Sequence, residues 1–177
     1  MEEPDPAAIT AASRGDVDAF TELVRAFQTP VWRFVSRLLG DREAAEDVTQ
    51  ETFLRAYRSL PTYAFRSKFS TWLFQIARNA AVDAQRSAAR RGRLQESIAR
   101  PRAAPPSDSM TYLDAGLRAL DGRLRESLVT VEVLGYTYRE AGVLLGVPEG
   151  TVKRRVHDAR ISLATWLADD EAASDEV

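Results

Sequence analysis

Residues 137–160 read TYREAGVLLGVPEGTVKRRVHDAR, and this stretch predicts a short helix, a tight turn and a second, longer helix. Thr137 and Glu140 have the spacing of a capping box, in which each side chain accepts a hydrogen bond from the other residue's backbone N–H. Gly146 and Pro148 then favour a turn, because glycine tolerates a left-handed backbone and proline does not continue a helix. This order of elements is that of a helix-turn-helix.

The second of these helices has an apolar side and a basic side. Its apolar stripe recurs at helical spacing and consists of Val152, Val156, Ala159 and Leu163. The outer face carries Thr151, Lys153, Arg154, Arg155, His157 and Arg160. In a helix-turn-helix this helix enters the major groove, where such side chains bond base edges. A helical hairpin with a solvated basic face is the alternative, but the capping box, the glycine turn and the positive face together favour DNA binding.

Helical spacing of apolar residues continues outward over most of the chain, and no stretch alternates as a strand would. We expect two helical segments that meet near Pro30. A third helix should begin after the cap Asp41 and stop at Pro61, and a fourth should begin at the cap Ser70 and end near Gly92. The predicted fold class is therefore all-α.

The same pattern divides the chain into two small helical domains. Residues 93–109 contain three prolines and no sustained apolar period, which indicates a flexible linker. The boundaries we expect are an N-terminal tail at 1–15, a helical domain at 16–92, the linker at 93–109, the helix-turn-helix domain at 110–167 and an acidic tail at 168–177.

Composition excludes several classes of site. The chain has no cysteine, and its single histidine, His157, has no second histidine or carboxylate at ligand spacing, so we expect no metal and no cofactor. No stretch approaches the roughly 20 apolar residues of a membrane span, and the N-terminus MEEPDP is acidic. We therefore expect a cytoplasmic protein with no membrane insertion.

Charge is unevenly distributed along the chain. Residues 65–104 carry nine bases and two acids, whereas the segments on either side carry more acids than bases. A polyanion such as DNA would be drawn to the middle segment despite the net charge of −2. Almost all the bases are arginine, whose planar guanidinium suits phosphate and guanine.

Three motifs resemble those of bacterial sigma factors of the extracytoplasmic-function (ECF) group, in the sigma-70 family. Residues 136–160 resemble the DNA-binding end of these factors. Residues 41–60, DREAAEDVTQETFLRAYRSL, resemble the helix that grips the clamp of RNA polymerase, and residues 69–92, FSTWLFQIARNAAVDAQRSAARRG, resemble the segment that reads and opens the minus-ten element. The resemblance covers nearly the whole chain. It implies a region 2-like domain, a region 4-like domain and a sigma factor that directs promoter-specific initiation.

One side of the third helix is acidic and polar. Spacings of three and four place four residues there, namely Asp47, Gln50, Glu51 and Leu54. An acidic helix face alone is usually only solvated. The resemblance implies that the polar members of this face dock on a basic, arginine-bearing surface of the polymerase clamp.

The segment PTYAFRSKFST, residues 61–71, interleaves aromatic and basic side chains, namely Tyr63, Phe65, Arg66, Lys68 and Phe69. Aromatic rings stack on unpaired bases while cations hold phosphates, and each stacked base contributes about 1–3 kcal/mol. The resemblance implies that this loop receives a flipped minus-ten base, and that contacts continue along the next helix at Trp72, Gln75, Asn79 and Arg86. Core packing is the alternative for Trp72 and the loop aromatics, above all for Phe69.

The resemblance also implies that the basic face of residues 151–160 reads the minus-thirty-five element. Two positions depart from the family. Gly142 lies inside the first helix of the motif, where it costs about 1 kcal/mol in helix propensity. Asp158 stands where a base is common, so the preferred DNA sequence stays open.

The partners implied are core RNA polymerase, through the clamp of its largest subunit and its flap, promoter DNA, and an anti-sigma protein. The alternative function is that of a stand-alone helix-turn-helix regulator with a ligand-sensing or dimerisation domain. In such a regulator, neither the aromatic loop nor the acidic face would have a role. An enzyme acting on nucleic acid is a second alternative. The sequence contains no phosphate-binding glycine loop, nucleophile elbow or metal-ligand cluster, so we expect no enzymatic activity.

Overall fold

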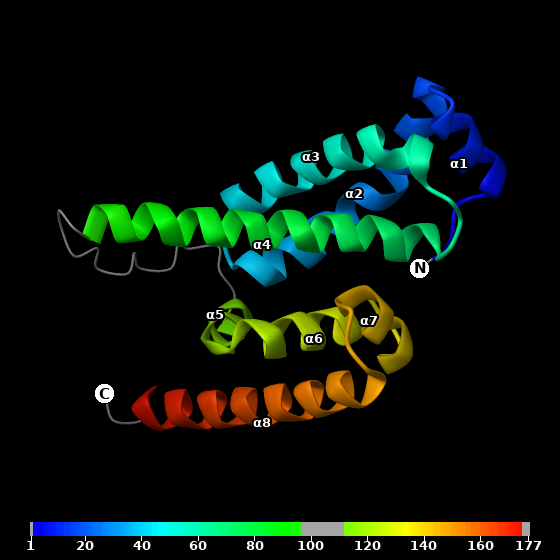
Figure 1. The fold of residues 1–177 in the computed structure, drawn as a ribbon. Helices are drawn as coiled ribbons and strands as arrows, with labels where there is room; N and C mark the ends of the chain where they lie inside the picture. The colour runs from blue at the N-terminus through cyan, green and yellow to red at the C-terminus, as the bar shows by residue number, and fades with distance from the viewer. Residues whose placement is uncertain (1, 97–111, 175–177) are drawn as a thin grey trace.

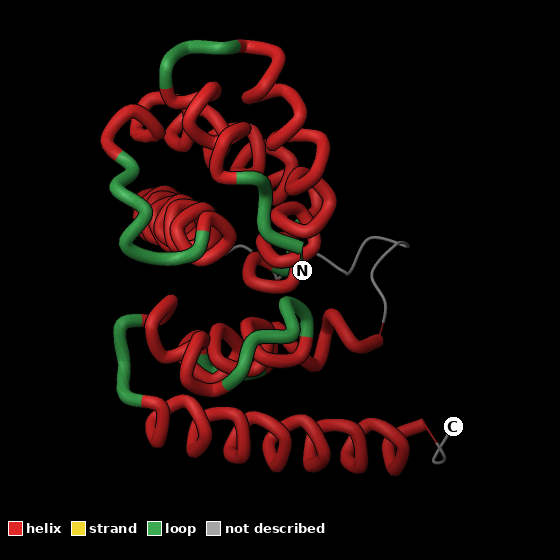
Figure 2. Tube along the Cα trace, turned by 90° about the vertical axis from the view of Figure 1, so that its right-hand side faces the viewer, coloured by secondary structure: helices red, strands yellow, loops and turns green. Residues whose placement is uncertain are grey.

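The structure is a computed structural model that describes residues 2–96 and 112–174. Every regular element in these ranges is a helix, so the predicted all-α fold is confirmed (Figure 2). The first domain consists of α1 (Pro6–Ser13), α2 (Val17–Leu39), α3 (Arg42–Ser59), a 3-10 turn η1 (Leu60–Thr62) and α4 (Phe69–Glu96). The second consists of α5 (Tyr112–Ala119), α6 (Gly122–Glu132), α7 (Tyr138–Leu145) and α8 (Glu149–Ser174).

Helix α2 packs against both α3 and α4 in the first domain (Figure 1). Phe34 of α2 meets Phe74 of α4 edge to face, with ring centroids 5.4 Å apart. Phe27 meets Phe69 in the same way, also at 5.4 Å. Aromatic pairs of this geometry contribute about 0.5–1.5 kcal/mol beyond their buried area. These contacts fix the position of α4, which carries most of the predicted minus-ten residues.

The expected break at Pro30 is wrong, because α2 runs without interruption through that residue. Proline in a helix interior removes one hydrogen bond and costs about 3 kcal/mol. The apolar stripe continues on both sides of it, however, and Phe27 and Val31 are buried. Burial of a side chain of this size contributes about 1.5–3 kcal/mol, so tertiary packing outweighs the local penalty.

Both ends of the described chain contain more helix than expected from the sequence. Within residues 1–15, α1 packs Ile9 and Ala12 into the core. The local signal is present, because the Asp5 side chain accepts from Ala7 N–H at 2.8 Å and Pro6 occupies the first turn, where proline is favoured. At the other end, α8 continues to Ser174. The alanines and the glutamate of that stretch favour a helix.

The predicted linker at 93–109 falls mostly outside the described residues. Helix α4 does not end near Gly92 but continues to Glu96. A single glycine costs only about 1 kcal/mol in a helix, and the arginines around Gly92 are good helix formers. Residues 97–109 lie outside the described ranges.

In the second domain, α6 and α7 lie between α4 and α8, as Figures 1 and 2 both show. Helices α6 and α8 pack against each other, and Leu128, Val129, Val152 and Val156 on these helices are buried. Because α6 and α7 cover the inner side of α8, the outer side of α8 is left facing away from the first domain. This orientation positions the predicted DNA-reading face.

Candidate functional site

The helix-turn-helix forms as predicted. Glu140 N–H donates to Thr137 Oγ1 at 3.2 Å, and Thr137 N–H donates to Glu140 Oε2 at 3.1 Å, so both halves of the capping box are present. Gly146 ends α7 with a φ of +67°, the left-handed conformation expected of it. Ala141 is fully buried between the helices. Helix α8 is thereby held firmly against α7.

Gly142 allows the close approach of the turn to α7. A Cβ added at this position would lie 2.8 Å from the carbonyl oxygen of Val147 and 3.4 Å from the backbone nitrogen of Glu149. The carbonyl of Gly142 also accepts from Val147 N–H at 3.0 Å. Glycine is therefore required for space, which explains why the chain tolerates its low helix propensity here.

We expect Gly142→Ala to lower the free energy of unfolding by up to about 2 kcal/mol, because overpacking costs about 1–3 kcal/mol and alanine returns about 1 kcal/mol of helix propensity. Urea unfolding followed by circular dichroism measures the change. Gly150→Ala is the matched control, since a Cβ there meets nothing within 4 Å, and it should be neutral or stabilising. Equal stabilities of the two variants would contradict the role given to Gly142.

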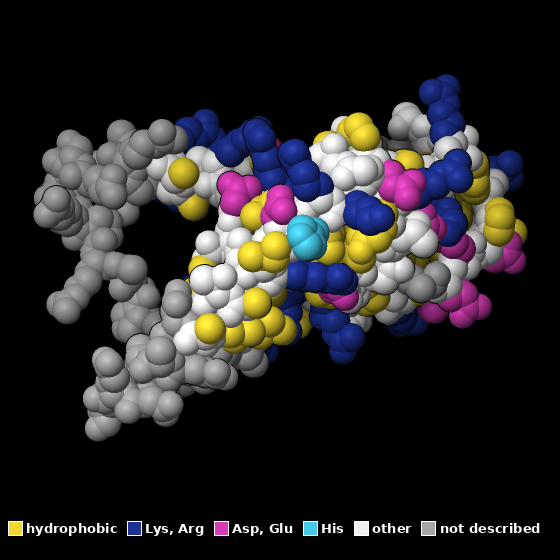
Figure 3. Space-filling model, turned by 90° about the horizontal axis from the view of Figure 1, so that it is seen from below, with side chains coloured by type: hydrophobic (Ala, Val, Ile, Leu, Met, Phe, Trp, Pro, Cys, Tyr) yellow, Lys and Arg dark blue, Asp and Glu magenta, His cyan; other side chains and the backbone are white. Residues whose placement is uncertain are grey.

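The outer side of α8 presents the predicted basic face. Figure 3 views the molecule from this side and shows several Lys and Arg side chains on it. Lys153, Arg154 and His157 are exposed, while Thr151 and Arg155 are half-buried. Lys153 and Arg154 form no ion pair with any residue that the structure describes.

Arg160, the last member of that face, is exposed but paired. Its Nη2 lies 2.5 Å from Glu132 Oε1 of α6, and this hydrogen bond raises the pKa of the guanidinium. A DNA phosphate would have to compete with Glu132 for this cation. The guanidinium of Arg154 is therefore more available to a bound anion than that of Arg160.

The predicted acidic face on α3 is accessible. Asp47 and Gln50 are exposed, Glu51 is half-buried and Leu54 is 52% exposed. Tyr57, one turn further on, is 45% exposed and adds an apolar ring beside Leu54. An exposed leucine and tyrosine next to the exposed carboxylate of Asp47 are typical of a protein-binding surface with an apolar centre and a charged rim.

Glu51 is already paired, which sequence reasoning missed. Arg55 Nε donates to Glu51 Oε1 at 2.7 Å, and Arg55 Nη1 donates to Asp83 Oδ2 of α4 at 2.9 Å. The hydrogen bond to Glu51, followed by that to Asp83, raises the pKa of Arg55. Arg55 offsets the negative charge of Glu51. Glu51 would therefore attract a basic partner less strongly than Asp47 would. The four-residue spacing of Glu51 and Arg55 could have shown the first pair.

Tyr63 lies at the centre of an aromatic cluster in the loop between η1 and α4. Its ring centroid is 4.8 Å from that of Phe65 and 5.0 Å from that of Trp72. The Tyr63 hydroxyl donates to the carbonyl of Ser67 at 2.6 Å, which closes the loop. Burial, with a smaller contribution from Glu3, raises the pKa of this hydroxyl. The loop is therefore a packed aromatic unit.

Phe65 is the most accessible ring of this cluster, with 50% of it exposed, and its neighbour Arg66 is also exposed. Phe65 has a φ of +54°, the one positive value among the described residues other than glycine. Backbone strain of this kind costs about 1–3 kcal/mol and concentrates at functional sites. The strained backbone presents the ring outward beside a cation.

Phe69 is too deeply buried to make its predicted contact with minus-ten DNA. It is 3% exposed and packs against Phe27, Tyr63 and Trp72, with ring centroids 5.4, 6.0 and 5.5 Å away. Its position on the buried side of α4 overrides the aromatic-basic pattern of the loop. We assign Phe69 to the core, as the support behind the loop, and correct the predicted DNA contact.

The other predicted residues on and before α4 fall into two groups. Asn79 and Arg86 are exposed, and Trp72 is half-buried. Lys68 and Gln75 instead contact the second domain. Lys68 Nζ donates to Glu140 Oε1 at 2.7 Å, and Gln75 Nε2 donates to the carbonyl of Val143 at 3.3 Å. The Lys68 hydrogen bond, and next the Thr137 backbone, lower the pKa of Glu140 to about 2.

Ser70 does not cap α4, because the helix begins one residue earlier, at Phe69. The Ser70 N–H and hydroxyl both donate to the carboxylate of Glu3, the former at 3.3 Å, and the Tyr136 hydroxyl donates to Ser70 Oγ at 3.1 Å. Glu3 and Ser70 are 67 positions apart. No local pattern predicts such a contact.

Comparison with known families places both domains. The sigma-70 region 2 family matches residues 23–91, and the sigma-70 region 4 family matches residues 110–163. The ECF RNA polymerase sigma factor SigC of Mycobacterium tuberculosis is 36% identical over 94% of this chain and 94% of its own length. The ECF RNA polymerase sigma factor SigW of Bacillus subtilis is 32% identical over 91% of this chain and 95% of its own.

The chain belongs to the ECF RNA polymerase sigma factors. The predicted function as a sigma factor, a transcription initiation factor, is confirmed, and a stand-alone regulator is not favoured. Within this sigma factor, the α3 face and the aromatic loop both fall in the region 2 match. The basic face of α8 falls in the region 4 match.

The chain shares its fold with solved structures of other proteins. CnrH, solved in complex with the cytosolic domain of CnrY, superposes with a TM-score of 0.73 at 26% identity, over 93% of this chain and 97% of CnrH. RpoE of Bartonella quintana, solved with the anti-sigma factor NepR, also gives a TM-score of 0.73, at 24% identity, over 86% of this chain and 98% of RpoE. The latter similarity is one of fold alone.

Within residues 2–96 and 112–174, no group of three or more His, Asp or Glu side chains is arranged to hold a metal ion. None of the helices in those ranges is both long and apolar enough to cross a membrane.

Proposed function

We propose that this sigma factor uses three separate surfaces, one for core RNA polymerase and two for promoter DNA. The surfaces come from different elements, namely α3, the aromatic loop with α4, and α8. Each presents side chains whose chemistry matches its partner. This division would let one chain hold the enzyme and read two promoter elements at once.

The α3 face is the proposed contact for the polymerase clamp. Asp47 supplies an exposed carboxylate and Gln50 an exposed amide. Leu54, one helical turn after Gln50, supplies exposed apolar area. Carboxylates of this kind pair with arginine-bearing surfaces and steer the encounter of the two proteins. Glu51 supports this contact more weakly, because Arg55 already pairs with it. The second domain would contact the flap.

The aromatic loop is the proposed pocket for an unpaired minus-ten base. Phe65 offers an exposed ring, Arg66 a cation for the backbone, and Tyr63 with Trp72 a rigid support. A stacked base contributes about 1–3 kcal/mol, and extrusion of a base costs a similar few kcal/mol. Capture of one or two bases therefore offsets the opening of the duplex. Asn79 and Arg86 would extend the contact along α4, and so would Lys68, Trp72 and Gln75.

The outer side of α8 is the proposed minus-thirty-five reader. Lys153, Arg154 and His157 are its exposed members, with Thr151 and Arg155 at its edge and Arg160 held by Glu132. Arginine in the major groove bonds the two acceptors of guanine. Arg154 is suited to this role, because no described acid pairs with it.

We expect Arg154→Ala to reduce discrimination between the correct and a substituted minus-thirty-five element by about 1–3 kcal/mol, because a bidentate contact to guanine is lost. Transcription from matched promoters that differ at single positions measures this loss. Lys153→Ala is the comparison, and it should weaken all promoters alike if Lys153 holds phosphate. If Arg154→Ala also weakens every promoter equally, Arg154 holds phosphate too.

We further propose that this sigma factor has no catalytic activity of its own, since RNA synthesis belongs to the polymerase. It would act in the cytoplasm, where bacterial polymerase and chromosome meet. An anti-sigma protein is the proposed regulator, and the complex of RpoE of Bartonella quintana with the anti-sigma factor NepR supports this proposal. Affinity purification from unstressed cells should recover such a protein. A free and fully active sigma factor in those cells would contradict this proposal.

One observation carries the proposed function above all: an exposed aromatic ring on a strained loop stands in the same chain as a helix-turn-helix. A protein that binds only duplex DNA meets no unpaired base on which such a ring could stack. Permanganate footprinting tests the difference. Thymines near minus ten should become reactive only when this chain and core polymerase are both present, whereas protection of duplex DNA by the chain alone, with no opening, would contradict the proposal.

A further inference from the structure

An exposed stripe of side chains runs along α4 from the aromatic loop toward its other end. Its members are Trp72, Asn79, Asp83, Arg86 and Arg90, which follow one another at intervals of seven, four, three and four residues and so share one side of the helix. Trp72 is half-buried, and the other members of this α4 stripe are exposed. Three of the five are proposed minus-ten contacts, so the stripe continues that surface.

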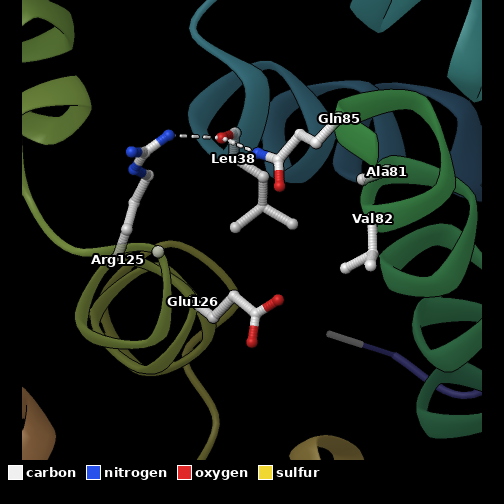
Figure 4. A pocket seen from close by; sticks show the side chains of 7 residues that line it. Leu38, Ala81, Val82, Gln85, Arg125 and Glu126 are labelled. Atoms are coloured by element: carbon white, nitrogen blue, oxygen red, sulfur yellow. Dashed lines mark hydrogen bonds between the residues drawn. The ribbon is translucent and has the colours of Figure 1, made fainter. Parts of the chain in front are cut away.

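Another side of α4 is turned toward neighbouring helices. Ala81, Val82 and Gln85 line a small hollow together with Leu38 of α2 and Arg125 of α6 (Figure 4). Gln85 Nε2 donates to the carbonyl of Leu38 at 3.1 Å. Because these residues point into the hollow, the α4 stripe points away from it and is accessible to a partner.

Asp83 is the one acid among the five residues of the α4 stripe. Its side chain is 54% exposed. A carboxylate repels the phosphates of DNA, and like charges placed against each other in an interface oppose binding. A surface that receives DNA at this position therefore requires a cation beside Asp83.

Arg55 supplies this cation from α3, which lies alongside α4 (Figure 1). The hydrogen bonds that it donates to Glu51 and to Asp83 hold its guanidinium from two helices. Arg55 is absent from the residues that the sequence assigned to DNA. Spacing along α3 could not reveal this position, because Asp83 lies 28 residues further along the chain.

One group of the Arg55 guanidinium is left over. Nε donates to Glu51 and Nη1 to Asp83, whereas Nη2 donates to no residue that the structure describes. A guanidinium has donors on all three nitrogens, in a fixed plane that suits phosphate. The Arg55 side chain is 37% exposed, so a phosphate that lies along the α4 stripe can reach it.

Stability alone does not explain this bridge between α3 and α4. Ion pairs between exposed side chains contribute little to stability and are weakened by salt. The bridge does, however, hold a long and otherwise flexible arginine side chain in one place. Such an arrangement favours binding, because the side chain is already ordered before the ligand arrives.

We propose that Arg55 is a further DNA contact of this sigma factor: Glu51 and Asp83 hold its guanidinium at the edge of the α4 stripe, and its Nη2 group donates to a phosphate of promoter DNA. The α4 stripe belongs to the minus-ten surface of the proposed function, and the inference rests on that assignment. Arg55 adds to this surface a residue of α3, the helix proposed to contact core polymerase.

The test compares Asp83→Asn with Arg55→Gln/Asp83→Asn, because both lack the acid and differ only in the cation. Every variant of the full chain also carries Lys153→Ala/Arg154→Ala, which weakens the competing basic face of α8. The probe is a labelled, mixed-sequence duplex of about 20 base pairs with a single-stranded tail, and anisotropy gives its affinity at about 50 and about 200 mM salt. Arg25→Gln is the control for lost charge, because exposed Arg25 pairs with Glu22 of its own helix.

The affinity of Asp83→Asn should fall about threefold more over this salt range than that of Arg55→Gln/Asp83→Asn, because one phosphate contact contributes a salt slope of about 0.7 to 0.9. Arg25→Gln should keep the slope of the parent. Arg55→Gln alone should bind more weakly than the double variant, since it leaves Asp83 without its cation. Equal slopes in the compared pair would overturn the proposal.

A lysine variant keeps the test decisive if the loss of Arg55 disturbs the packing of α3. Arg55→Lys/Asp83→Asn retains a cation for phosphate and should keep the slope of Asp83→Asn. A slope as low as that of Arg55→Gln/Asp83→Asn would overturn the proposed contact. Thermal unfolding of each variant checks the fold.

Arg86→Ala separates this inference from the proposed function. Arg86 is an exposed cation of the α4 stripe, so its loss should weaken probe binding. If Arg86→Ala binds the probe as tightly as the parent, the assignment of α4 to the minus-ten surface is contradicted, while the slopes of the compared pair still decide the role of Arg55.

Discussion

Asp47→Arg is expected to weaken the binding of this sigma factor to core RNA polymerase by about 2–5 kcal/mol, because it places a cation against a basic surface. Asp47 is exposed and forms no ion pair with a described residue, so its replacement should leave the fold intact. Fluorescence anisotropy of labelled sigma factor titrated with core polymerase measures the affinity. Thermal unfolding of the same sample checks the fold.

Glu22→Arg is the matched control for this charge reversal. Glu22 is an exposed acid on α2 whose pair, Arg25, lies on the same helix. The control should keep nearly full affinity, and Glu51→Arg should lose less affinity than Asp47→Arg, because Arg55 already offsets the Glu51 charge. Equal affinities of the Asp47 and Glu22 variants would show that the α3 face does not contact the polymerase.

Phe65→Ala and Phe69→Ala should separate function from stability in the same loop. Phe65 is half exposed, so its loss should cost little stability but remove a stacked base, worth about 1–3 kcal/mol of open complex. Phe69 is buried among three aromatic rings, so its truncation should destabilise the fold by about 3–5 kcal/mol. Thermal unfolding and permanganate reactivity measure the two effects.

Phe65→Tyr should open promoters as the parent protein does, because tyrosine keeps an aromatic face for stacking. A Phe65→Ala variant that opens promoters normally would contradict the proposed base pocket. A Phe69→Ala variant with unchanged stability but defective opening would return Phe69 to the DNA contacts.

Local sequence signals predicted much of the fold. The capping box of Thr137 and Glu140, the glycine turn and the Asp41 cap are all formed. They were predictable because each rests on residues within four positions of one another. The path through Pro30 could not be predicted in the same way, because it depends on packing of α2 against α3 and α4. The Asp5–Pro6 start of α1 is also a local signal, but it lies in an acidic N-terminus whose composition favours a tail.

The same contrast between local signals and contacts from distant elements applies to the candidate site. Periodicity placed the exposed members of the α3 and α8 faces, because a helix face follows from spacing alone. It could not show that Glu132 holds Arg160 or that Asp83 extends the Glu51–Arg55 pair, since these partners come from other helices. It also could not decide between the two roles of Phe69, because that residue fits both the aromatic-basic pattern and the buried stripe of α4.

In vitro run-off transcription shows whether this sigma factor directs initiation at promoters with two DNA elements. Purified chain and core RNA polymerase are mixed with a library of genomic fragments, and the starts of the transcripts are sequenced. We expect starts that appear only when the chain is present and that share two upstream elements, near minus ten and minus thirty-five. If the chain binds core polymerase but directs no start on any genomic fragment, it does not act as a promoter-specificity factor.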